Sequence, residues 1–222
     1  MKNILVTGAT GFIGSNLIIR LLELGHNVRA FHRSNSNSLT LKSIDVEHYI
    51  GDTRDRDSLR NAMRGCDTVF HTAAVVSFWR KKYPELYSTN VDGTKNIVEV
   101  CLETGVEKLI HTSSIAALGF RTDGQLIDEN TVYNWGTKIG YKYSKHLAEL
   151  EVFKGIEKGL NAVIVNPSVV VGPRDIYIHG GQIIRDIKRR TIPVYIEGGM
   201  NIVNVCDVVA GHIAAAKLGR TG

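Results

Sequence analysis

The feature that most restricts the fold of this chain is a glycine-spaced segment near its N-terminus, TGATGFIG over residues 7–14. It follows the apolar run 4–7 and precedes a stretch of helical length at 12–24. Glycines spaced in this way allow a tight turn, a close approach of backbone to a ligand, and close packing of a helix on a strand. Amides at a helix N-terminus also attract phosphate groups. The segment therefore predicts a strand–turn–helix unit that holds a pyrophosphate, although its spacing is one residue longer than the G-x-G-x-x-G fingerprint.

Short apolar runs alternate with longer amphipathic stretches along most of the chain. This alternation is typical of βαβ units, and right-handed crossovers then place helices on both faces of one sheet. The expected strands are 4–7, 28–32, 46–50, 68–72, 108–112 and 162–166, and the expected helices are 12–24, 57–64, 84–103 and 137–158. The sequence thus predicts an α/β fold with a doubly wound parallel sheet.

The alternation ends after residue 172, where prolines and glycine pairs become frequent. We expect a dinucleotide-binding domain over 1–172, part of a small substrate lobe over 173–198, and a return of the chain to the first domain over 199–222. The last segment is expected to contain a strand at 202–205 and a helix at 207–218. Because the chain stops on a turn-like Gly-Arg-Thr-Gly sequence, we expect the C-terminal lobe to be incomplete.

Composition excludes several classes of protein. The 222 residues are 43% hydrophobic, which is enough for a substantial core, and no run approaches the roughly 18 to 20 apolar residues needed to cross a bilayer. The formal charge of +5 is mild and dispersed, so no nucleic-acid partner is expected. The eight histidines form no metal-ligand spacing, and the three cysteines are expected to be buried, unpaired thiols in a cytoplasmic protein.

The residues that follow the second and third expected strands indicate which dinucleotide, NAD(H) or NADP(H), the chain would bind. An NAD site usually places a carboxylate after the second strand, whereas this chain has Arg33 and Ser34, which could bind a 2′-phosphate. NADP(H) is therefore favoured over NAD(H), unless Arg33 is an ordinary surface residue. Asp52 follows the third strand, where it would either accept a hydrogen bond from the adenine amino group or cap the next helix.

Three further residues carry the expected chemistry. Tyr141 and Lys145 are four residues apart and so share one face of the helix expected at 137–158. A nearby ammonium would stabilise the phenolate of a tyrosine, whose ordinary pKa is about 10. Ser114 lies just beyond the fifth strand, at the sheet edge where ligands bind, and its hydroxyl could hold a substrate oxygen.

In these residues, and in Asn166-Pro167-Ser168, the chain resembles the extended branch of the short-chain dehydrogenase/reductase superfamily. Within that branch it is most similar to the dihydroflavonol-reductase-like and NAD-dependent epimerase/dehydratase group. The resemblance implies a Rossmann fold, Tyr141 as catalytic acid/base, Lys145 as the residue that tunes it and binds the nicotinamide ribose, and Ser114 as the substrate-orienting hydroxyl. It also implies a homodimer built on the helix that carries Tyr141, and a chain that continues beyond residue 222. The expected cofactor ligands are Gly8, Thr10, Gly11, Phe12, Ile13, Gly14, Arg33, Ser34, Asp52, Thr53, Thr72, Ala73, Ala74, Asn90, Thr112, Tyr141, Lys145, Pro167, Ser168, Val169 and Val170.

Three functions remain open at this point. The first is an oxidoreductase that reduces a carbonyl or oxidises an alcohol of a small molecule, and the second is a nucleotide-sugar epimerase that keeps its nicotinamide bound. The third is a module that senses NADP(H) without chemistry. A sugar 4,6-dehydratase is disfavoured, because that group has Thr-Asp-Glu where this chain has Thr112-Ser113-Ser114. Phe78, Trp79 and Tyr83 could line a substrate site or serve only packing.

Overall fold

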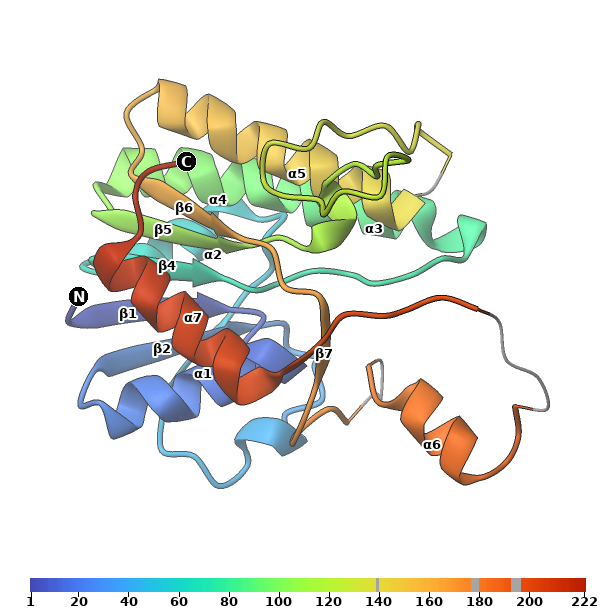
Figure 1. Cartoon of the computed structure of the whole chain (residues 1–222). Helices are drawn as coiled ribbons and strands as arrows, with labels where there is room; N and C mark the ends of the chain where they lie inside the picture. The colour runs from blue at the N-terminus through green and yellow to red at the C-terminus, as the bar shows by residue number, and fades with distance from the viewer. Residues whose placement is uncertain (139, 177–179, 193–196) are drawn as a thin grey trace.

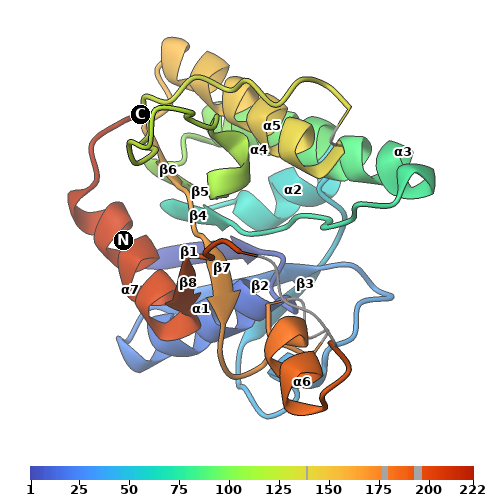
Figure 2. The same cartoon turned by 45° about the vertical axis from the view of Figure 1, so that its right-hand side comes forward.

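The computed structural model describes residues 1–138, 140–176, 180–192 and 197–222. Its centre is a six-stranded, wholly parallel sheet in the order β3-β2-β1-β4-β5-β6, which confirms the doubly wound prediction (Figure 1 and Figure 2). The order reverses between β1 and β4, and an open parallel sheet binds its ligands at such a switch point. The strands are β1 Asn3–Thr7, β2 Asn27–His32, β3 Glu47–Ile50, β4 Thr68–His71, β5 Lys108–Thr112 and β6 Ala162–Val165.

Helices cover both faces of this sheet (Figure 1). One face carries α1 Phe12–Glu23 and α7 Val205–Leu218, and the other carries α2 Arg56–Met63, α4 Gly93–Thr104 and α5 Gly140–Glu157. Neighbouring residues of β1 explain the arrangement, because Ile4 belongs to the core under α1 and α7 whereas Leu5 belongs to the core under α2, α4 and α5. Successive side chains of a strand point to opposite faces, so a strand buried on both faces is apolar throughout.

The helical stretch expected at 84–103 is interrupted. A 3₁₀ turn at Arg80–Lys82 leads into α3 Tyr83–Tyr87, a π-helical turn follows at Ser88–Asp92, and α4 begins at Gly93. Single π turns of this kind are frequent near functional sites. Further 3₁₀ turns occur at Leu39–Leu41 and Ile115–Ala117.

Between β6 and α7 the chain forms a second, smaller unit. Strand β7 Val169–Val171 pairs in parallel with β8 Ile202–Asn204, and α6 Gln182–Lys188 lies beyond this pair (Figure 2). Neither β7 nor α6 was predicted, since both are short and flanked by glycine and proline. Parts of the expected substrate lobe, at 177–179 and 193–196, lie outside the described residues, and the domain limits at 172 and 198 stay predictions.

None of the helices within the described ranges is long and apolar enough to cross a membrane. All three cysteines have free thiols, as expected. Cys66 and Cys101 are buried, but the expectation of burial is wrong for Cys206, which is exposed on the first turn of α7.

Candidate cofactor and active site

The glycine-spaced turn is packed directly against the chain that leaves β4. Gly8 has a φ of +67°, and a Cβ there would lie 2.7 Å from the Cα and N of Ala73. A Cβ on Gly14 would lie 2.3 Å from the carbonyl oxygen of Gly8. Gly11 is the N-cap of α1 and carries no side chain that could occupy the first amides of the helix. The turn therefore presents backbone N–H groups at a helix N-terminus, which suits a phosphate group.

Two adjoining cavities open along the carboxyl ends of the strands. The first measures about 250 Å³ and the second about 660 Å³, and both are lined by Gly11, Thr72 and Ala74. Of the expected ligands, the first cavity brings together Gly8, Thr10, Gly11, Arg33, Asp52, Thr53, Thr72, Ala73 and Ala74. The second brings together the expected catalytic residue Ser114 and the expected ligands Gly11, Phe12, Ile13, Gly14, Thr72, Ala74, Thr112, Tyr141, Lys145, Pro167, Ser168, Val169 and Val170.

Two expected ligands lie elsewhere. Ser34 is exposed and does not line the first cavity, whereas the next three residues, 35–37, do. Asn90 is 1% exposed, and its amide accepts from Val75 N at 2.7 Å and donates to Val75 O at 2.9 Å and to Ser144 Oγ at 3.0 Å. The buried Asn90 amide therefore holds the segment after β4 in place, and its hydrogen bonds go to the protein and not toward the cavity.

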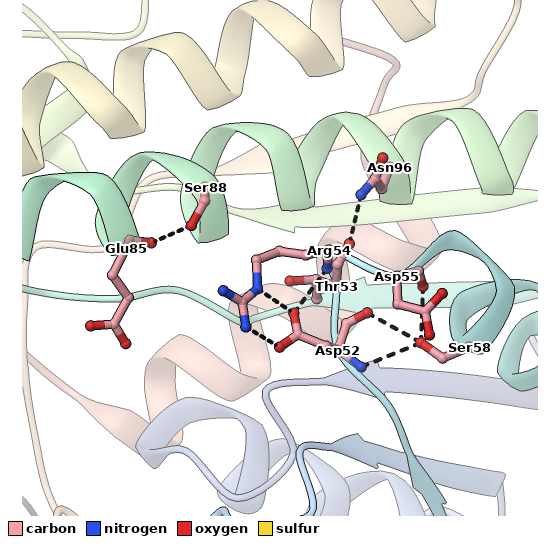
Figure 3. A network of polar contacts seen from close by, with 8 residues as sticks. All are labelled: Asp52, Thr53, Arg54, Asp55, Ser58, Glu85, Ser88 and Asn96. Atoms are coloured by element: carbon pink, nitrogen blue, oxygen red, sulfur yellow. Dashed lines mark hydrogen bonds and ion pairs between the residues drawn. The ribbon is translucent and has the colours of Figure 1, made fainter.

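Asp52 sits at the rim of the first cavity, held by Arg54 (Figure 3). Its carboxylate accepts from Arg54 N at 2.9 Å, Nε at 2.9 Å and Nη2 at 2.6 Å. The hydrogen bond from the Arg54 side chain is the main cause that lowers the pKa of Asp52. The alternative that Asp52 caps the following helix is wrong, because α2 is capped by Asp55, whose carboxylate accepts from Asp57 N at 3.0 Å.

The three expected catalytic residues reach the second cavity from two elements. Tyr141 and Lys145 lie on successive turns of α5, while Ser114 follows β5 and its hydroxyl oxygen accepts from Ala116 N at 3.2 Å. Lys145 is 3% exposed, and its Nζ donates to Thr112 O at 2.8 Å. Phe78 packs edge-on against Tyr141, with ring centroids 5.7 Å apart.

The electrostatics of this group differ from the expectation in one respect. Burial raises the pKa of Tyr141, and the Ser114 hydroxyl opposes the rise only in part, so the anticipated net stabilisation of the phenolate by Lys145 is not what the structure shows. Burial lowers the pKa of Lys145 to about 8. The Glu149 carboxylate acts in the opposite direction and offsets only part of this decrease. At neutral pH the phenol is protonated and most of the Lys145 population is an ammonium ion.

The apolar wall of the second cavity was only partly anticipated, since the sequence pointed to Phe78 alone among its residues. It is formed mainly by Val76, Phe78, Ile115, Phe120, Ile127 and Trp135. Most of these residues lie in the long irregular segment between β5 and α5, which has no periodicity to mark it, and only its position after a strand end could have suggested a binding role. Trp79 does not line the cavity, and Tyr83 accepts from Gly140 N at 3.1 Å, which anchors the start of α5.

Comparison with known proteins places this geometry in a family. The model of the NAD dependent epimerase/dehydratase family matches residues 4–222. The chain is 43% identical over 218 residues to a putative dihydroflavonol 4-reductase of Synechocystis sp., covering 97% of this chain and 63% of the relative. It is 36% identical over 219 residues to sterol demethylase protein B of Methylococcus capsulatus, covering 98% of this chain and 67% of the relative.

Solved structures agree with these sequence matches. The crystal structure of gox2253 is 44% identical, with a TM-score of 0.92, and the alignment covers 100% of this chain and 68% of that one. The UDP-glucose 4-epimerase of Thermus thermophilus, solved in complex with NAD, is 28% identical with a TM-score of 0.81, over 96% of this chain and 74% of the epimerase. The chain belongs to the NAD dependent epimerase/dehydratase family, within the extended branch of the short-chain dehydrogenase/reductase superfamily.

Proposed function

We propose that this chain is the dinucleotide-binding part of an NADP(H)-dependent oxidoreductase that reduces a carbonyl, or oxidises the corresponding alcohol, of a small molecule. The observation that carries the proposal is the convergence of Tyr141, Ser114 and Lys145 on one cavity that adjoins the glycine-spaced turn. The chain spans about two thirds of the length of the relatives it matches, so the activity is proposed for the whole protein.

The residues present fit a nicotinamide dinucleotide. The absence of a Cβ at Gly8 and Gly14 lets the turn pack tightly against Ala73 and the Gly8 carbonyl, and this packing sets the amides at the start of α1 that would bind a pyrophosphate. The first cavity would then take the adenosine half. When bound, the cofactor supplies or accepts a hydride. Pro167 to Val170 and Lys145 line the second cavity, where they would hold the nicotinamide half.

In the proposed reduction the protein supplies a proton and orientation. Tyr141 is protonated at neutral pH and donates its phenolic proton to the substrate oxygen. Ser114 donates a hydrogen bond to the same oxygen and so fixes its position. Burial disfavours the phenolate that remains, and the Lys145 ammonium, anchored on Thr112 O, would offset part of that cost once the proton has left. In the oxidation of an alcohol the same groups act in reverse.

The preference for NADP(H) rests on the charge at the first cavity. Arg33 lines it beside the polar residues 35–37, and the Asp52 carboxylate is already paired with Arg54. A 2′-phosphate would meet a guanidinium there. Because a charge-assisted hydrogen bond contributes about 1.5 to 3 kcal/mol, Arg33→Ala should weaken the binding of 2′-phospho-ADP-ribose about tenfold or more and leave that of ADP-ribose almost unchanged. Equal effects on both ligands would count against the preference.

A nucleotide-sugar epimerase is the second candidate, favoured by the fold it shares with the Thermus enzyme. The full-length protein distinguishes the candidates when it is mixed with NADPH and a panel of ketones and aldehydes. Exchangeable NADPH that is consumed supports a reductase, tightly retained cofactor with conversion of a UDP-sugar supports an epimerase, and exchange without turnover supports a sensor. Tyr141→Phe should abolish turnover while NADPH affinity stays within about twofold, and an active Tyr141→Phe enzyme would refute the assignment.

We also propose a homodimer formed through α5. Leu150 and Phe153 are three residues apart on this helix and are 39% and 43% exposed, so they share a face and offer neighbouring apolar side chains that a second copy could cover. Light scattering coupled to size-exclusion chromatography should give twice the chain mass for the wild type and a monomer for Phe153→Glu. A monomeric wild type would contradict the proposal.

A further inference from the structure

Glu149 is a buried acidic residue that the proposed reaction leaves without a role. It is 7% exposed and lies one turn beyond Lys145 on α5, so that Tyr141, Lys145 and Glu149 form a stripe with a spacing of four residues. A buried carboxylate is costly unless polar groups satisfy it. The partner of this one is therefore informative.

The Glu149 carboxylate is bound by Asn166, which follows β6. Asn166 Nδ2 donates to Glu149 Oε1 at 2.6 Å and to the carbonyl oxygen of Ser114 at 3.1 Å. The amide thus links α5 to the main chain of Ser114. Because Glu149 accepts from the same NH₂ group, it fixes the direction in which that group points.

Two backbone hydrogen bonds, one on each side of Ser114, join the Asn166 contact to form what we call the Ser114 clamp. Ser113 N donates to Val165 O at 2.8 Å, and Ile115 N donates to Pro167 O at 3.1 Å. The Ser114 carbonyl that Asn166 holds directly precedes the second of these amides. Without the Asn166 side chain, the backbone of Ser114 would be held only by the hydrogen bonds of Ser113 N and Ile115 N.

The charge of Glu149 also reaches Lys145. Tyr141 and Glu149 lie one turn to either side of Lys145 on α5. The titratable groups that interact with the charge of Lys145 are Glu149, His71 at the end of β4 and His111 on β5. Burial and the Lys145 charge lower the pKa of His71 to about 3 and hold the pKa of His111 well below its ordinary value, so both rings are neutral. Among these described groups, Glu149 supplies the negative charge that favours the ammonium form.

We propose that Glu149 is a positioning residue of the active site, which orients Ser114 through Asn166 and keeps Lys145 protonated through its charge. This inference rests on the proposed function for its catalytic consequence. Its two parts make different predictions, because glutamine keeps an acceptor oxygen for Asn166 and removes the charge, whereas alanine removes both.

The kinetic test compares pH profiles of kcat for carbonyl reduction by the full-length protein. Glu149→Gln should turn over near the wild-type rate at pH 6 and lose activity at a lower pH than the wild type on the alkaline side. Glu149→Ala should be slower by about tenfold or more even at pH 6, because small displacements of a positioned group are costly. Glu151→Gln is the matched control, since Glu151 lies on the same helix but pairs with Lys154, and its profile should be unchanged.

A second readout is independent of turnover. The NMR signal of ¹³C-labelled lysine, assigned with Lys145→Arg, reports the titration of Lys145, whose midpoint should move to lower pH in Glu149→Gln. Asn166→Ala tests the Ser114 clamp separately: it should slow turnover and leave the Lys145 midpoint in place. If the wild type turns over no carbonyl, the proposed function fails while the NMR titration still decides the electrostatic part. An unshifted Lys145 midpoint in Glu149→Gln, or full activity in Asn166→Ala and Glu149→Ala, would overturn the inference.

Discussion

The glycine-spaced turn makes a sharp prediction, because the structure sets two physical effects of one substitution against each other. Gly14 lies in the first turn of α1, where alanine is better than glycine by at most about 1 kcal/mol in helix propensity. A Cβ at this position would lie 2.3 Å from Gly8 O and 2.9 Å from Thr72 Oγ1. Carbon requires roughly 3.5 Å, so the turn or the helix must move by about 1 Å.

Steric overlap of this size in a well-packed region costs about 1 to 3 kcal/mol, which exceeds the gain in propensity. Gly14→Ala should therefore be destabilised by up to about 2 kcal/mol, which lowers the melting temperature by about 2–4 °C per kcal/mol for a chain of this length. The displacement also moves the amides that would hold a pyrophosphate. We expect the dissociation constant for NADPH to rise at least tenfold, which corresponds to about 1.4 kcal/mol.

Gly211→Ala is the matched control. Gly211 lies inside α7, and a Cβ there would have no heavy atom within 4 Å. Only the propensity effect remains, so this substitution should stabilise the protein by about 0.5 to 1 kcal/mol and leave NADPH binding unchanged. Urea unfolding and titration calorimetry measure both quantities. A Gly14→Ala protein that matches Gly211→Ala in stability and NADPH affinity would refute the steric argument.

Three further predictions concern buried His71, the cysteine thiols and the N-cap of α2. The pKa of His71 is about 3 in the folded protein and near 6.5 in the unfolded chain, so between these values the unfolded state binds one more proton. The free energy of unfolding should therefore fall by about 1.4 kcal/mol for each pH unit below pH 6.5. Urea unfolding at a series of pH values should show a weaker dependence of this free energy on pH for His71→Asn. An exposed thiol reacts readily, so a thiol reagent should label Cys206 quickly and reach Cys66 and Cys101 only after unfolding. An absorbance assay that counts the thiols labelled before and after unfolding checks this order. Asp55→Ala removes the N-cap of α2 and should cost about 1 kcal/mol in thermal unfolding, with NADPH binding retained.

The sequence alone determined the scaffold and the position of the chemical groups along it. Strands buried on both faces read as short apolar runs, and the central sheet follows directly from their alternation with helices. The glycine spacing of TGATGFIG was enough to predict a turn between a strand and a helix, because the conformations that require glycine are local properties of the backbone. Tyr141 and Lys145 share a helical face through their separation of four residues, which is also a local property.

The tertiary structure decided what those groups are surrounded by. The raised pKa of Tyr141 is caused by burial, which no local pattern records. Asn90 was expected at the cofactor, but the π turn that carries it directs its amide to Val75. The link from Glu149 through Asn166 to Ser114 joins three segments that are distant in sequence, and it exists only because parallel strands bring their carboxyl ends to one edge of the sheet.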